Sequence, residues 1–262
     1  MRCARPRFGR VNWAVAMRKT KYVLLAAFVL PLADPSFAEK TAETGRLPTR
    51  GSGGALVNAT VPALVPVNVP GEARPPVQTA IAEKIGAEGI AAFRSGNFAG
   101  AREAYLRVLK IEPDNLPALV NLGSTEYRLG NSREGERLLR RSLQIKPDNP
   151  TAWLNLGIIY LERDEPMRSL AAIAQAVAQD PNDAVTRNYL GVAAGRNRWF
   201  DAAESELRRA IELQPDYADA HFNLAVFCLE RNPPAVELAR RHYQKALELG
   251  AAPDRLIEKA LK

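Results

Sequence analysis

Apolar residues recur along this chain with a period of 34 residues. Four prolines mark the period, because they stand 34 positions apart: Pro113, Pro147, Pro181 and Pro215. Between these prolines, small and large apolar residues are spaced by four positions, which is the spacing of one helical face. The pattern predicts five helix-turn-helix units, over residues 82–115, 116–149, 150–183, 184–217 and 218–251.

The two helices predicted in each unit carry small residues at matching places. In the first helix a large residue is followed directly by a small one, at Leu122-Gly123, Leu156-Gly157, Leu190-Gly191, Leu224-Ala225 and, in a degenerate form, Glu88-Gly89. In the second helix a small residue precedes a large one by four positions, at Ala101/Tyr105, Gly135/Leu139, Ser169/Ile173, Ala203/Leu207 and, displaced by two residues, Ala239/Tyr243. Since small side chains shorten the distance between packed helices, the two helices of a unit are expected to pack closely.

Turn residues separate the units. Proline has no N–H and its ring clashes with the preceding turn, so each of the four prolines is expected to end a second helix. Asp or Asn follows every time, as in Pro113-Asp114-Asn115, and these side chains suit a turn or the N-cap of the next helix. After the fifth unit, Gly250 is expected to stop the closing helix, and residues 252–262 are expected to form a short capping helix.

The third unit carries the most complete motif. It reads Trp153-Leu154-Asn155-Leu156-Gly157-Ile158-Ile159-Tyr160 and closes with Pro181. This resembles the tetratricopeptide repeat family, whose 34-residue helix-turn-helix has the pattern W-x2-L-G-x2-Y, then A-x3-F, then P. The other units replace the leading aromatic residue, with Leu119, Arg187 and His221. The resemblance covers about residues 82–249 and implies an all-α, right-handed superhelical solenoid, whose concave groove of first helices holds an extended or helical peptide.

The resemblance also implies which residues a peptide would contact. Asparagine occupies one place in three first helices, at Asn121, Asn155 and Asn223, and in the fourth unit Tyr189 interrupts the column with Asn188 beside it. An amide offers donors and an acceptor, so the column is able to pair with the main chain of a peptide. The alternative is that these asparagines bond only to their own neighbours.

Aromatic and basic residues near the ends of the first helices are further candidate contacts. Tyr127 is expected either to add an apolar wall to the groove or to pack between repeats. Arg94 and Arg128 share their place in the repeat with Arg196, and such arginines suit an acidic group. The full carboxylate clamp of the family is not expected, because the early groove positions carry Gly86 and Val120 in place of basic residues.

The first 38 residues have the composition of a secretory signal peptide. The stretch Met17-Arg18-Lys19-Thr20-Lys21 is a charged n-region, Tyr22–Leu30 is a short apolar h-region, and Ser36-Phe37-Ala38 is a small-x-small cleavage site. A bilayer-spanning helix needs about 20 apolar residues, so a stable membrane span is the minor alternative. We expect translation to start at Met17, cleavage to occur near Ala38, and the protein to be periplasmic or secreted.

Residues 39–80 are expected to form a disordered linker. The segment contains prolines at 48, 62, 66, 70, 75 and 76 and the run Gly51-Ser52-Gly53-Gly54. Frequent prolines prevent a helix or a central strand and favour an extended, polyproline-like chain. The segment is therefore expected to be a tether for the repeats.

Removal of the leader changes the charge of the chain. Residues 1–38 hold seven of the 36 basic residues and one of the 29 acidic residues, so the remainder has 29 basic and 28 acidic residues. A nearly balanced charge gives no reason to expect a nucleic-acid partner.

Sequence motifs for catalysis are missing. The chain has no Gly-rich phosphate loop, zinc-ligand cluster or Gly-x-Ser-x-Gly elbow. His221 and Cys228 share a helical face, but seven residues of helix separate them by about 10 Å, which is too far for a thiolate–imidazole pair. Cys228 is expected to be a small buried residue. The sequence thus predicts neither an enzyme nor a cofactor or metal site.

Together these observations predict an exported scaffold that binds a protein or peptide partner in its concave groove. Two alternatives stay open. One is an accessory subunit of an envelope secretion, pilus or polysaccharide-export assembly, and the other is a structural protein that self-associates into dimers or longer arrays. The fold alone does not select among them.

Overall fold

The computed structural model describes residues 76–262, and every regular element in this part of the chain is an α-helix. The predicted signal peptide and most of the predicted linker lie outside the described residues. The helices are α3 (Pro76–Arg94), α4 (Phe98–Ile111), α5 (Leu116–Arg128), α6 (Ser132–Ile145), α7 (Pro150–Glu162), α8 (Pro166–Gln179), α9 (Ala184–Arg196), α10 (Phe200–Leu213), α11 (Ala218–Glu230), α12 (Val236–Glu248) and α13 (Arg255–Ala260).

Capping side chains begin the first helices of the middle units. The side chain of Asn115 accepts a hydrogen bond from the N–H of Ala118, and that of Asn149 accepts one from Ala152. Asp183 accepts hydrogen bonds from the backbone at the start of α9 in the same way. Each of these residues stands two positions after a repeat proline, so one short turn ends one unit and caps the next.

Helix α3 starts earlier than the repeat pattern predicts. It begins at Pro76, six residues before the expected register at Ala82 and within the predicted linker. Proline suits the first turn of a helix, where an N–H has no partner, and no glycine or further proline interrupts the chain up to Ile85. The additional turn projects Val77, which is 70% exposed.

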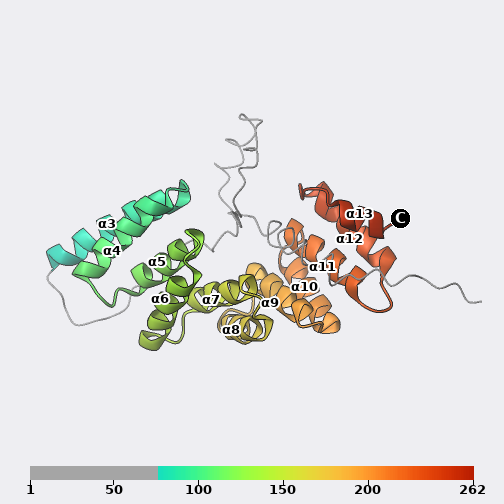
Figure 1. The fold of residues 1–262 in the computed structure, drawn as a ribbon, viewed down its shortest axis with the longest axis horizontal. Helices are drawn as coiled ribbons and strands as arrows, with labels where there is room; N and C mark the ends of the chain where they lie inside the picture. The colour runs from blue at the N-terminus through green and yellow to red at the C-terminus, as the bar shows by residue number, and fades with distance from the viewer. Residues whose placement is uncertain (1–75) are drawn as a thin grey trace, which may run out of the picture.

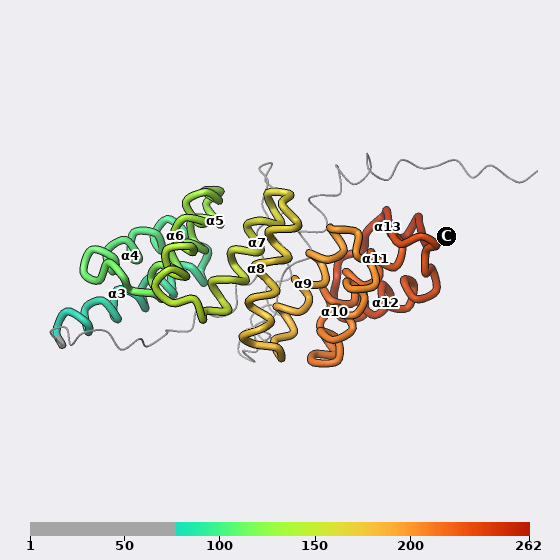
Figure 2. The backbone as a smooth tube through the Cα atoms, turned by 90° about the horizontal axis from the view of Figure 1, so that it is seen from below, coloured from blue at the N-terminus to red at the C-terminus, as the bar shows by residue number. Residues whose placement is uncertain are grey.

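The helices form pairs that stack into an arc (Figure 1). Helices α7 and α8 pack against each other, as do α9 with α10 and α11 with α12, and α8 and α10 also pack against the first helix of the following pair. The first helices α5, α7, α9 and α11 contact one another directly and run along the inner side of the arc. Figure 2 shows the pairs following one another in chain order along the molecule. The all-α solenoid implied by the repeat resemblance is thus confirmed.

Close packing within each pair depends on the small residue of the first helix. A Cβ built on Gly157 would lie 2.3 Å from Cγ1 of Ile173, and one built on Gly191 would lie 2.7 Å from Cγ of Leu207. These partners are the large residues predicted for the second helices. The glycine therefore provides the space into which the large side chain of its own unit packs.

Helix α13 covers the C-terminal end of the arc. Its Ile257 is buried, and the carboxylate of Asp254 accepts hydrogen bonds from the N–H groups of Leu256 and Ile257. The N–H of Asp254 donates to the hydroxyl of Tyr243 in α12 over 2.6 Å. This is the capping helix expected from the sequence. Among the helices that the structure describes, none is both long and apolar enough to cross a membrane.

Candidate functional site

The inward faces of α5, α7, α9 and α11 form a continuous surface, called here the inner wall. Tyr160 of α7 faces the opposite way, because its hydroxyl accepts hydrogen bonds from Arg140 of α6 and Arg168 of α8. At 100° per residue, Ile158 and Glu162 stand about 160° around the helix from Tyr160 and so face inward. The 34-residue period gives Ser124, Val192 and Val226 the place of Ile158, and it gives Arg128, Arg196 and Glu230 the place of Glu162.

The predicted asparagines lie between successive first helices at this wall. All four are buried. The amide Nδ2 of Asn155 donates to the hydroxyl of Ser124 in α5 over 2.9 Å, and Nδ2 of Asn223 donates to Oδ1 of Asn188 over 3.0 Å. Asn188 also lies 3.4 Å from the Tyr217 hydroxyl, so both of its amide atoms are bonded within the chain. Asn155, Asn188 and Asn223 therefore join neighbouring first helices, whereas Asn121 interacts with Tyr105 of α4. The contact of the four asparagines with a peptide stays a prediction.

Two acceptors of this asparagine row have no partner. The Oδ1 atoms of Asn155 and Asn223 are buried, and neither accepts a hydrogen bond. A buried polar atom without a partner costs about 1–3 kcal/mol. The amide nitrogens are bonded to α5 and α9, so the two Oδ1 atoms are the parts of these side chains that have no partner.

Three tyrosines and a carboxyl group lie together at the wall between α5 and α11. Tyr189 is buried, and burial raises its pKa well above the ordinary value, with smaller contributions from Tyr217, Tyr127 and Asp219. Asp219 is 7% exposed, and its burial raises its pKa to about 8. Of this group, only Tyr127 was predicted as a site residue. The sequence signal for Asp219 is a carboxylate in the second position of α11, where the preceding units have Pro117, Thr151 and Val185.

The charged positions of the wall do not form a row of arginines. Arg94 is exposed on α3, and the guanidinium of Arg128 lies 4.6 Å from the centre of the Phe98 ring. Arg196 donates to Asp164 over 3.3 Å. Glu162 of α7 separates Arg128 from Arg196 along the row, so the arginines are spread over three helices with an acidic residue between them.

Glu230 ends this charged row on α11. Burial raises its pKa to about 7, an effect that Arg196 and Arg198 oppose. One of its oxygens is buried and accepts no hydrogen bond. Within the described first helices, the buried side-chain atoms without a partner are this oxygen and the Oδ1 atoms of Asn155 and Asn223.

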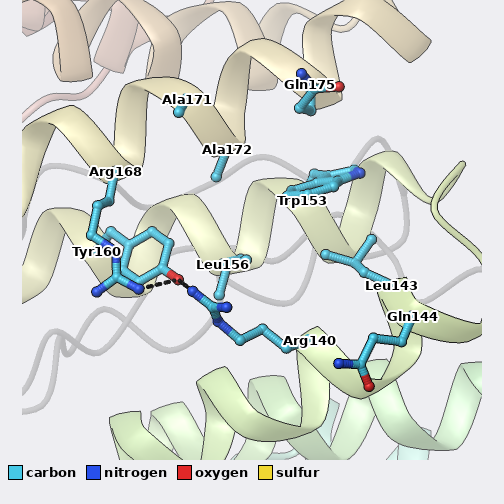
Figure 3. Close-up of a pocket in the computed structure, with 10 residues that line it drawn as sticks. All are labelled: Arg140, Leu143, Gln144, Trp153, Leu156, Tyr160, Arg168, Ala171, Ala172 and Gln175. Atoms are coloured by element: carbon cyan, nitrogen blue, oxygen red, sulfur yellow. Dashed lines mark hydrogen bonds between the residues drawn. The ribbon is translucent and has the colours of Figure 1, made fainter.

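Apart from the inner wall, a depression lies on the outer side of the solenoid, between α6 and α8 (Figure 3). It has a volume of about 560 Å³, with Trp153 and Leu156 of α7 at its floor and Ala171, Ala172 and Gln175 on the α8 side. At one end Arg140 and Arg168 both donate to the Tyr160 hydroxyl. The sequence signal for this depression is the small side chain of Ala171, at the place in the repeat where α6 has Arg137. The arginines also pair with Glu136, so they are not an open anion site.

The two histidines bond to each other. Nε2 of His221 lies 3.2 Å from the carbonyl oxygen of Pro215, and Nδ1 of His221 lies 2.9 Å from Nδ1 of His242. If Nε2 donates to that carbonyl, Nδ1 of His221 accepts the hydrogen carried by His242. Cys228 is buried as predicted, and its burial raises its pKa to about 11, which keeps the thiol protonated. Within residues 76–262, no three His, Cys, Asp or Glu side chains gather closely enough to hold a metal ion.

Comparison with known proteins identifies the repeat. A family model described as a tetratricopeptide repeat matches residues 87–150, 120–184 and 189–255, which is more than half of the chain. A crystal structure of the MamA protein is 26% identical, covers 66% of this chain and 91% of that chain, and has a TM-score of 0.55.

Two further structures are similar in fold. The structure of MamA from residue 41 to its end, from Desulfovibrio magneticus RS-1, is 19% identical, with coverage of 66% and 94% and a TM-score of 0.57. The crystal structure of YrrB, described as a TPR protein with an unusual peptide-binding site, is 20% identical, with coverage of 70% and 95% and a TM-score of 0.54. No curated protein matches the chain.

Proposed function

The chain belongs to the tetratricopeptide repeat family, and we propose that it is an exported scaffold that binds an extended segment of another protein along its inner wall. The observation that carries this proposal is the pair of buried, unpartnered acceptors, Oδ1 of Asn155 and Oδ1 of Asn223. An extended peptide has N–H groups that no secondary structure occupies, and it presents them at regular intervals. Such a peptide is the ligand that satisfies both acceptors without a requirement for particular side chains.

The rest of the wall supports the same ligand class. The inward place of three successive units is held by the apolar residues Ile158, Val192 and Val226. Glu230 adds a third buried oxygen without a partner at the α11 end. The likeness to YrrB, whose structure is described as having a peptide-binding site, favours the same use of the fold.

Export is the second part of the proposal. It rests on the charged, apolar and small-x-small regions between Met17 and Ala38. N-terminal sequencing of the protein isolated from the cell envelope is expected to give Glu39 as its first residue. A chain that keeps Met17 and stays in the cytoplasm would contradict export, and it would leave peptide binding unaffected.

Peptide binding is tested by main-chain chemistry. Twelve-residue peptides selected from a random library on the full chain are resynthesised with an N-methyl group at each position in turn. Loss of one hydrogen bond is worth about 0.5–1.5 kcal/mol, so N-methylation is expected to weaken binding by about threefold to tenfold at two or more positions. Peptides whose affinity is indifferent to every N-methyl group would overturn main-chain recognition.

A double variant tests whether the peptide contacts the inner wall. Asn155→Leu with Asn223→Leu is expected to reduce the affinity of the selected peptides by about tenfold. Asn182→Leu is the matched control, because Asn182 is exposed in the turn before α9, and it is expected to bind peptides as the natural chain does. Circular dichroism of each variant checks that the helices are intact. Equal binding by all three proteins would move the interface to another face.

A further inference from the structure

The depression between α6 and α8, called here the outer depression, lies where other units carry a larger side chain. The 34-residue period gives Ala172 the place of Leu138 in α6 and Glu206 in α10, and the displaced register of α12 gives it the place of His242. In those units the larger residue meets the one at the place of Trp153: Leu138 lies in one buried cluster with Leu119, Glu206 bonds to Arg187 over 2.7 Å, and His242 bonds to His221 over 2.9 Å. The third unit has only a methyl group there, and a volume of about 560 Å³ lies beside Trp153.

The rim of the outer depression also departs from the repeat. Gln175 of α8 stands where the other second helices carry a basic residue, at Arg107, Arg141, Arg209 and Lys245. Gln175 and Gln144 of α6 are exposed and line the depression from its two sides. An uncharged amide is able both to donate a hydrogen bond to a main chain and to accept one from it. The rim therefore suits the backbone of a bound segment.

One end of the outer depression is positively charged. Arg140 and Arg168 donate to the Tyr160 hydroxyl, and the guanidinium of Arg168 lies 4.2 Å from the centre of the Tyr160 ring. A network of ion pairs surrounds this hydroxyl and joins Glu136 and Glu165 to Arg140, Arg163 and Arg168. Three guanidinium groups share two carboxylates, so the network has one excess positive charge. The arginines are not an anion site by themselves, but this charge favours an acidic neighbour over a basic one.

The lining selects one kind of occupant. The rings of Trp153 and Tyr160 lie toward opposite ends of the depression (Figure 3), and aromatic rings pack well on one another in offset or edge-to-face arrangements. The volume of about 560 Å³ is within the range of about 300–1,000 Å³ found for ligand sites. An aromatic side chain with a carboxylate next to it fits both the apolar floor and the charged end.

We propose that the outer depression is a binding site for a partner protein, from which it takes an aromatic side chain and an adjacent Asp or Glu. The site lies on the opposite side of α7 from the inner wall, so it does not depend on the proposed function. A segment on the inner wall and another in the outer depression are able to bind at the same time. The chain would then connect two different partners.

The first test uses a capped dipeptide as the probe. N-acetyl-Phe-Asp-amide is titrated into the full chain while the indole N–H resonance of Trp153, identified with Trp153→Phe, is followed by NMR. The probe is expected to shift this resonance. It is expected to bind about tenfold more tightly than N-acetyl-Ala-Asp-amide, which lacks the ring, and about twofold to fivefold more tightly than N-acetyl-Phe-Lys-amide. No shift, or equal affinity for either of the other two dipeptides, would overturn the proposal.

Two variants of α8 locate the probe. Ala171→Glu places at the edge of the depression the side chain that α4 carries as Glu103, one turn after Arg168, where it competes with the carboxylate of the probe. It is expected to weaken binding by about fivefold. Ala174→Glu is the matched control, because Ala174 is exposed on the same helix and does not line the depression, and it is expected to bind as the natural chain does. Equal binding by the two variants would overturn the proposal.

The mass of the full chain in solution tests a second copy as the occupant. A dimer that excludes the probe and that Ala171→Glu dissociates would assign the outer depression to self-association and overturn the proposal. The outcome is independent of the inner wall. Probe binding by a chain that binds no selected twelve-residue peptide would support this inference and contradict the proposed function, and peptide binding without probe binding would do the reverse.

Discussion

The indole N–H of Trp153 donates a hydrogen bond to the carbonyl oxygen of Pro147 over 2.8 Å. Pro147 lies in the turn that ends the second unit, and Trp153 lies in the first helix of the third, so the bond fixes the turn against the helix that follows it. The same six-residue relationship recurs one and two periods later, from Arg187 to Pro181 and from His221 to Pro215. Three chemically different side chains thus make the same contact in successive units, each with the carbonyl oxygen of the proline six residues before it.

Removal of the indole donor is expected to destabilise the solenoid. Trp153→Phe keeps an aromatic ring but removes this donor, and the Pro147 carbonyl then keeps the bond from the amide of Gln179, 3.1 Å away. The loss of the indole bond is expected to cost about 1 kcal/mol. The free energy of unfolding in urea measures the loss. Trp199→Phe is the control, because Trp199 is 49% exposed before α10, and its effect is expected to stay within about 0.5 kcal/mol. Equal losses in the two variants would show that the Pro147 bond contributes nothing.

The tight packing of Gly157 makes a second prediction. Gly157→Ala would place a Cβ 2.3 Å from Ile173, so either the Ile173 side chain or the helices α7 and α8 must shift. The free energy of unfolding is expected to fall by about 1–3 kcal/mol. Gly86→Ala is the matched control, since a Cβ there meets nothing within 4 Å inside α3. Alanine is expected to stabilise that site by about 0.5–1 kcal/mol. A stabilising Gly157→Ala would contradict the close approach of the two helices.

Asp219 is expected to make stability fall as pH rises. Burial raises its pKa in the folded chain to about 8, against about 3.9 in an unfolded chain. Between these values the folded state holds a proton that the unfolded state releases, so the folded state loses stability with increasing pH.

Asn at this position removes that dependence. Asp219→Asn is expected to be more stable than the natural chain at pH 8, by on the order of 2 kcal/mol, and about equal to it at pH 4. Urea unfolding at a series of pH values gives both quantities. Asp216→Asn, in the exposed turn before α11, is expected to show no such trend. A difference that is constant with pH would exclude titration of Asp219 as the cause.

The histidine pair is expected to make stability fall as the pH decreases, which is opposite to the effect of Asp219. Burial, and then the neighbouring His221 and Arg208, lower the pKa of His242 to about 4, against about 6.5 in an unfolded chain. Between these values the unfolded chain binds a proton that the folded chain does not bind. Stability that is present above pH 6.5 is therefore lost as the pH falls toward 4.

His242→Gln keeps a donor for His221 and removes this titration. Because His242 is partly exposed, the loss of stability of the natural chain between pH 6.5 and 4 is expected to exceed that of the variant by only about 1 kcal/mol. Glu204 and Lys245 remain beside the pair in both proteins. Parallel curves for the two proteins would contradict the role of the histidine pair.

The periodic pattern was sufficient to predict the architecture. Helix starts at Leu116, Pro150, Ala184 and Ala218, the partnership of Gly157 with Ile173, and the capping helix near Ile257 follow from local signals: a proline, a small residue opposite a large one, and a capping side chain. Such signals act over a few residues or within one helix pair. They are therefore readable without knowledge of the rest of the fold.

The roles of the polar residues depended on the tertiary structure. Sequence alone left two uses open for Asn155 and Asn188, and only the stacking of α5, α7, α9 and α11 shows their amides bonded between helices. Arg140 of α6 bonds to Glu136 in its own helix and to Tyr160 of α7. Hydrogen bonds and pKa shifts depend on distances between segments some 30 residues apart. The period determines that these segments are neighbours, but only their packing determines which polar atoms meet and which, like Oδ1 of Asn155, stay unpartnered.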